Sequence, residues 1–283
     1  MTRSKVMLVL GAAVAALLAC NSGSSDTPPG ESSSSGGSSS GGSSSSGGSS
    51  SGGSSSGGSS SGGSSSSSGS TDGGADGDGG PQWVGDGGVS SAMSFFVTSR
   101  GPGNGGDLRA AGGADGLAGA DAFCKQLANA VSPVLGAKTW RAYLSTGTVA
   151  ARSRIGTGPW YNAKGVMIAA DLAQLHDEGG KTNALSLANT LDELGNPVPI
   201  AAPNLHDILT GSNAAGGTTA THCNNWTSNA TNQTASVGHS NRAGGGAAPT
   251  SWNAAHATQG CAENGGQSVR SGGGRGSFYC FAP

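Results

Sequence analysis

The segment GLAGADAFC, residues 116–124, holds the pattern that decides the fold. The apolar residues that recur from there at the spacing of one helix face are Ala120, Phe123, Leu127 and Val131. Asp121 is placed to cap or charge the first turn, and Pro133 lies just beyond the last. The pattern predicts the best helix of the chain, and this helix carries Cys124.

Short strands are predicted on both sides of this helix. The aromatic run SFYCF, residues 277–281, predicts a strong strand that carries Cys280. The further predicted elements are strands at 94–98, 140–145 and 206–211, a hairpin of 160–161 with 166–169, and a short helix at 149–155. Because small and polar residues fill the rest, we predict an α+β domain of mixed short strands, one or two helices and a long polar loop region.

Five cysteines divide into one that stands alone and four in the later part of the chain. Cys20 directly follows an apolar run, whereas the other four are Cys124, Cys223, Cys261 and Cys280. An even number of cysteines in a chain that leaves the cytoplasm predicts two disulfides. Four cysteines allow three pairings, and their spacing does not choose among them.

The first residues have the organisation of a bacterial export signal. Arg3 and Lys5 precede an apolar stretch at residues 6–19 that is too short for a comfortable membrane span. The sequence Leu-Leu-Ala ending at Cys20 resembles the lipobox, in which the cysteine sulfur accepts the lipid. We predict a signal peptide at 1–19 and lipidation of Cys20, and Asn21 favours sorting to the outer membrane, facing the periplasm or the cell surface. An ordinary secretory signal with an incidental cysteine is the alternative.

Residues 20–80 are predicted to be a lipidated cysteine followed by a disordered linker. Serine and glycine dominate the segment, which has almost no apolar side chains to bury against the entropy cost of ordering. A glycosylated serine stalk is the alternative. Two of the 14 basic residues lie in the signal peptide and five of the 16 acidic residues lie in the linker, so the predicted domain at 81–283 is close to neutral. Near-neutral charge gives no indication of nucleic-acid binding.

The order of these motifs resembles the C-type-lectin-like fold, and more closely its endostatin-like branch and bacterial lectin-like surface domains. The segments that carry the resemblance are 96–98, 116–124, 140–145, 210–212, 223–228 (CNNWTS) and 278–280. The resemblance implies nested disulfides, with Cys124 bonded to Cys280 and Cys223 bonded to Cys261. The outer bridge would tie the first helix to the last strand, and the inner one would brace the long loop region.

The residues argue against the calcium site found in sugar-binding C-type lectins. Calcium needs several charged oxygen ligands, and Glu263 is the only acidic residue between Ser212 and Pro283. The five histidines form no short-spaced metal motif, and we expect His206 and Asp207 to be a surface pair. We therefore predict no metal site and no cofactor. No nucleophile motif or phosphate-binding loop is present, so we predict that the protein is not an enzyme.

The candidate ligand-binding residues lie in the uncharged loop region around 212–260, where amides and aromatic rings suit a polar ligand. They are Asn224, Asn225, His239, Asn241, Trp252 and Asn253. Trp140 and Trp226 are expected in the core, whereas Trp252 lies among polar residues and is the better candidate for stacking on a sugar. Arg141, Arg152 and Arg154 are expected to be solvated surface residues.

These observations predict a monomeric, lipid-anchored bacterial surface protein that presents a lectin-like recognition domain to a glycan or a surface protein. This step rests on analogy of fold. A structural envelope or matrix lipoprotein without a small ligand is the second hypothesis, and a secreted enzyme of unknown type is the third.

Overall fold

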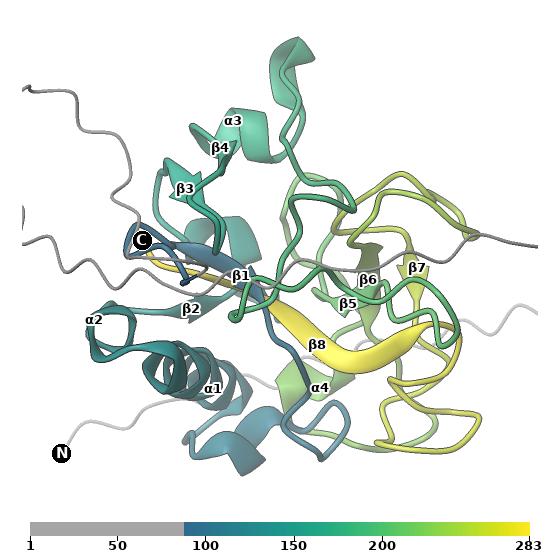
Figure 1. Cartoon of the computed structure of the whole chain (residues 1–283). Helices are drawn as coiled ribbons and strands as arrows, with labels where there is room; N and C mark the ends of the chain where they lie inside the picture. Colours follow the sequence, from purple (N-terminus) through teal and green to yellow (C-terminus); the bar gives the residue numbers. More distant parts are fainter. Residues whose placement is uncertain (1–87) are drawn as a thin grey trace, which may run out of the picture. The chain divides into compact units, whose positions relative to one another are not determined.

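The computed structural model describes residues 88–283 (Figure 1). The predicted signal peptide, Cys20, the linker and the first residues of the predicted domain lie outside the described residues. The described strands are β1 Phe95–Val97, β2 Arg141–Ala142, β3 Trp160–Tyr161, β4 Met167–Ala169, β5 Asp207–Leu209, β6 Ser236–His239, β7 His256–Ala257 and β8 Gly274–Phe281. The helices are α1 Gly116–Val131, α2 Pro133–Gly136, α3 Leu172–Leu175 and α4 Cys223–Trp226, with short 3-10 turns at Leu108–Ala111, Ala151–Ser153 and Glu178–Gly180. The prediction of an α+β domain is confirmed.

β8 is the centre of the main sheet, and Figure 1 shows it running as one long curved strand past the others. Its second half pairs antiparallel with both β1 and β2, and Phe281 lies opposite Phe95 and Arg141. Its first half pairs parallel with β5, which continues the sheet to β6 and β7. β3 and β4 form the separate hairpin that the sequence predicts.

The sheet separates two hydrophobic cores, because alternate side chains of a strand point to opposite faces. Phe278 and Cys280 of β8 join the core on one face, where α1 packs with Phe123 and Leu127. Tyr279 and Phe281 join the core on the other face, with members from the β3–β4 hairpin and the loops. Both faces of β8 are thus buried, which explains its nearly continuous run of large apolar residues.

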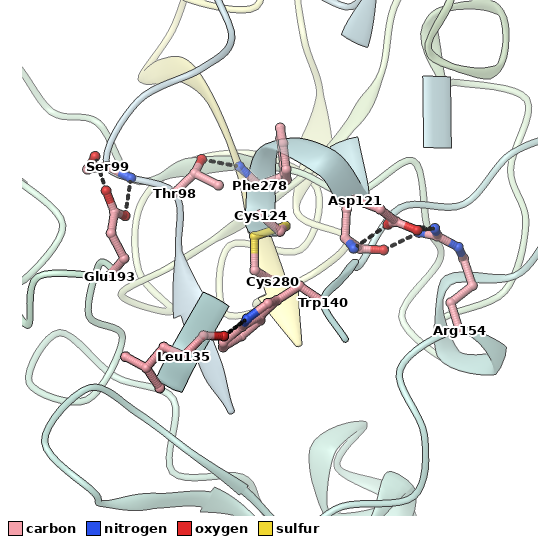
Figure 2. The surroundings of a disulfide bond; sticks show 11 residues. Thr98, Ser99, Asp121, Cys124, Leu135, Trp140, Arg154, Glu193, Phe278 and Cys280 are labelled. Atoms are coloured by element: carbon pink, nitrogen blue, oxygen red, sulfur yellow. Dashed lines mark hydrogen bonds and ion pairs between the residues drawn. A yellow bond between two sulfur atoms is a disulfide. The ribbon is translucent and has the colours of Figure 1, made fainter. Parts of the chain in front are cut away.

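Two disulfides are present, and they have the nested arrangement. Cys124 of α1 bonds Cys280 of β8, which closes a loop with a sequence separation of 156 residues. Cys223 bonds Cys261 across a separation of 38 residues. Figure 2 shows the outer bridge between α1 and β8, close to the indole of Trp140. Trp140 and Trp226 are buried, as expected.

Two charged residues near α1 differ from expectation. The carboxylate that caps α1 belongs to Asp115, which accepts a hydrogen bond from the Ala118 amide. Asp121 instead pairs with Arg154, with a nitrogen–oxygen distance of 2.8 Å, and accepts from the Ala142 amide (Figure 2). The Arg154 side chain is only 10% exposed, so its prediction as a solvated surface residue is wrong. The aspartate neutralises the guanidinium and lets it enter the protein.

A buried histidine, His176, lies beside the core that contains Tyr279 and Phe281. The Nε2 atom of His176 is 2.8 Å from the Tyr143 hydroxyl, and its Nδ1 is 2.8 Å from the Leu172 carbonyl. A carbonyl only accepts hydrogen bonds, so Nδ1 donates, and in the neutral ring Nε2 accepts from the tyrosine. Burial favours this neutral imidazole, because it lowers the pKa of His176.

We expect this histidine to destabilise the domain below about pH 6.5, the ordinary pKa of histidine. Below that pH the unfolded chain binds a proton at this histidine and the folded chain does not. The free energy of unfolding therefore decreases as the pH is lowered, by up to about 1.4 kcal/mol per pH unit, until the pKa of the folded state is reached. Chemical unfolding of the wild type and of His176→Gln between pH 5 and 8 measures this difference. Identical pH profiles would contradict it.

None of the helices among residues 88–283 combines the length and the apolar character that a membrane span requires.

Candidate metal centre

The register of three neighbouring strands brings histidines to one buried carboxylate. Asp207 of β5 lies directly opposite His239 of β6. His256 of β7 pairs with Val237, two residues before His239, and therefore lies on the same face of the sheet. His206 immediately precedes β5. Residues that are up to 50 positions apart in the sequence thus meet at one end of the sheet.

The three imidazoles converge on a single oxygen atom. Oδ1 of Asp207 lies 3.3 Å from Nε2 of His206, 3.4 Å from Nε2 of His239 and 3.4 Å from Nε2 of His256. The ligand atoms of His206, Asp207 and His239 all lie within 4.8 Å of one another. The rings of His206 and His239 are stacked, with centroids 4.2 Å apart.

The other nitrogen of each ring fixes its tautomer. Nδ1 of His239 is 2.9 Å from the Pro249 carbonyl, and Nδ1 of His256 is 3.0 Å from the Ala257 carbonyl. Nδ1 of His206 is 3.0 Å from Oδ1 of Asn241, an oxygen that also accepts from a backbone amide. Each Nδ1 therefore donates, so in the neutral rings each Nε2 presents a lone pair to the carboxylate.

The carboxylate oxygen and the Nε2 atoms that face it are all acceptors, so they cannot form hydrogen bonds with one another. Oδ1 of Asp207 and Nε2 of His239 have no hydrogen-bond partner, although Asp207 is 3% exposed and His239 fully buried. Burial raises the pKa of Asp207, against the opposing effect of the three histidines, and burial lowers the pKa of His239. A cation between the acceptors would satisfy all of them at once. The expectation that His206 and Asp207 form a surface pair is wrong, since both are buried.

The donor set and its dimensions fit zinc. Zinc bonds of 2.0–2.1 Å in a tetrahedron place neighbouring ligand atoms about 3.3 Å apart, close to the three separations between the Asp207 oxygen and the imidazole nitrogens. Imidazole nitrogen with one carboxylate oxygen is a zinc-type set, and the hydrogen bonds to Nδ1 are the outer-shell contacts that orient such ligands.

Glycines let the backbone pass close to the imidazoles. Gly244 has φ +129°, and a Cβ there would lie 2.6 Å from Cε1 of His206. The neighbouring Gly245 and Gly246 line a surface pocket of about 390 Å³, together with all three histidines, Ala257, Gln259 and Gly272. His256 is the outermost of the three histidines, with 27% of its side chain exposed. The cluster therefore lies at the floor of a pocket that opens to solvent.

The six predicted ligand-binding residues do not form one site. His239 and Asn241 belong to the histidine cluster, whereas Asn224 and Asn225 line a different pocket with residues of α1 and the 146–149 loop. Asn224 and Asn225 lie in α4, where four consecutive residues, Cys223–Trp226, have positive φ. Such left-handed backbone is uncommon outside glycine.

The prediction that Trp252 contacts a ligand is wrong, because its side chain is 1% exposed. Its ring packs against Tyr143 and Tyr279, at centroid distances of 4.8 and 5.2 Å. Asn253 is also buried, and its amide donates to the Tyr143 hydroxyl and to two backbone carbonyls. Polar neighbours made this segment resemble a surface loop, but their hydrogen bonds are satisfied inside the domain.

Glu263, the single acidic residue of the long loop region, does not belong to the group of metal-ligating side chains. It forms an ion pair with Arg270 and accepts a hydrogen bond from the Gly105 amide. Sequence reasoning missed the histidine cluster because its members are distant in sequence. The available signal was that His206, His239 and His256 lie in one segment that is nearly free of other charges.

Comparison with models of protein families and with curated proteins finds no match for this chain.

Proposed function

We propose that the domain binds a zinc ion through His206, Asp207, His239 and His256. The observation that carries the proposal is the convergence of three Nε2 lone pairs on one buried carboxylate oxygen, with every Nδ1 engaged as a donor elsewhere. Without a cation these acceptors repel one another in a region of low dielectric. Zinc would hold β5, β6 and β7 together and would present one face to the pocket.

Zinc titration of the purified domain tests the proposal. We expect one equivalent to bind with a dissociation constant of about 10⁻⁷ M or lower, and to raise the melting temperature. His239→Ala should weaken binding by about 100-fold or more, because it removes a buried ligand. His222→Gln is the matched control, since His222 lies outside the cluster and caps α4. Unchanged zinc affinity in His239→Ala would refute the assignment.

For the whole chain we propose a lipid-anchored bacterial surface protein whose C-type-lectin-like domain recognises a ligand. The nested bridges support the likeness, since one ties the first long helix to β8 and the other flanks the polar loop region. Most residues that line the pocket above the histidine cluster belong to that same region, and this pocket is where we place the recognition of the ligand. The lipid anchor rests on the lipobox-like sequence before Cys20 alone.

A further inference from the structure

The charge around the candidate metal centre indicates the kind of ligand that the pocket accepts. Zinc with the Asp207 carboxylate and neutral imidazoles carries a net charge of +1. The other residues that line the pocket are Gly245, Gly246, Ala257, Gln259 and Gly272, and none of them is charged. An ion at this floor therefore retains unneutralised positive charge that faces solvent.

The wall of the pocket also has free hydrogen-bond donors. The backbone amides of Gly245, Gly246 and Gly272 donate to no other group among residues 88–283, and all three residues are exposed. The side-chain amide of Gln259 is exposed and has no hydrogen-bond partner within the same part of the chain. Donors without partners around a positive centre suit a ligand that brings negatively charged oxygen atoms.

Geometry leaves room for such a ligand at the ion itself. His206, Asp207 and His239 bring their ligand atoms within 4.8 Å of one another, while His256 joins from the solvent side and is partly exposed. Zinc with four protein ligands can expand to five-coordinate, and the fifth ligand would enter from the pocket side, next to the partly exposed His256. The pocket of about 390 Å³ is large enough for a single sugar unit and lies at the small end of the usual range for ligand sites.

We propose that this pocket binds a carboxylate-bearing sugar unit, with the carboxylate on the metal and the sugar hydroxyls on the glycine and Gln259 amides. This inference rests on the proposed zinc function. A carboxylate matches the single positive charge and is a normal zinc ligand. A neutral sugar would leave that charge unpaired, and a phosphate would bring more negative charge than the site offers.

Cobalt substitution separates this inference from the function on which it rests. Co²⁺ replaces zinc in such sites, and its visible absorption reports the coordination number. We expect glucuronate to weaken and shift the cobalt bands in a saturable way, whereas glucose at the same concentration leaves them unchanged. Acetate should act about tenfold more weakly than glucuronate, because it has no hydroxyl groups for the amide donors. Gln259→Ala should weaken glucuronate binding severalfold and leave cobalt affinity unchanged.

Each other outcome has a definite meaning. If cobalt and zinc bind but carboxylates leave the spectrum unchanged, the ion is closed to ligands and this inference fails while the zinc function stands. If acetate and glucuronate bind equally well, the assignment to a sugar fails. If glucose competes as well as glucuronate, the carboxylate has no role. If neither metal binds, the zinc function itself fails.

Discussion

Replacing Cys124 and Cys280 together by alanine should lower the free energy of unfolding by about 5 kcal/mol. The bridge closes a loop with a sequence separation of 156 residues, so in the chain-entropy model it removes much of the freedom of the unfolded chain. Both cysteines are also fully buried in the core between α1 and β8. A loss of this size approaches the whole stability of an ordinary domain.

Chemical denaturation of the oxidised wild type and of the double variant measures this effect. The matched control is the alanine pair at Cys223 and Cys261, whose shorter loop predicts a loss of about 4 kcal/mol. On heating, the variant without the Cys124–Cys280 bridge should also unfold at a lower temperature than the variant without the Cys223–Cys261 bridge. A smaller loss for the outer pair than for the inner pair would contradict the loop-length argument.

Asp207→Asn should separate metal affinity from stability. Asparagine keeps the shape of the side chain but removes the only anionic ligand of the cluster, so zinc affinity should fall by at least about 100-fold. The metal-free variant should be more stable than the metal-free wild type at pH 7, by roughly 1–3 kcal/mol. The reason is that Oδ1 is buried without a hydrogen-bond partner, and burial raises the pKa of this carboxyl.

Asp192→Asn provides the matched control, because Asp192 is a buried carboxylate that is fully used. It accepts hydrogen bonds from the amides of Leu194 and Asn196. This variant should lose stability and keep its zinc affinity, which is the opposite result on both measurements. Calorimetric zinc titration and urea unfolding in the presence of a chelator give the two readings. If Asp207→Asn binds zinc as tightly as the wild type, the centre does not use the carboxylate.

Local patterns predicted the elements that have strong periodicity or strong composition. The helix at residues 116–131 has an apolar face, β8 has a dense aromatic run, and the β3–β4 hairpin turns at Gly165, which has positive φ. The predicted boundaries at 94–98 and 140–145 were longer than the paired strands. The backbone beyond these strands still forms single hydrogen bonds, such as those from the Thr98 and Tyr143 amides to carbonyls of β8, but it does not continue the regular ladder.

Of the three strands that build the candidate metal centre, β5 lies within the strand predicted at 206–211, whereas β6 and β7 gave no comparable signal. β6 contains Gly238, at which a Cβ would lie 1.8 Å from the Trp252 carbonyl oxygen, and β7 has two residues. Glycine and histidine are poor indicators of a strand, so neither segment was predicted. Because the register between β5, β6 and β7 was unknown, nothing in the sequence placed His239 opposite Asp207. Pairing between distant segments is a property of the whole fold.

The position of β8 in the chain also has a consequence for biogenesis. β8 follows every other element, yet it supplies the hydrogen-bonding partner of β1, β2 and β5. A chain that emerges amino terminus first therefore holds three strands with open edges, and a cysteine in α1 without its partner, until β8 is out. Incompletely folded chains of this protein must be kept from contacting one another, because unpaired strand edges on two chains pair and cause aggregation.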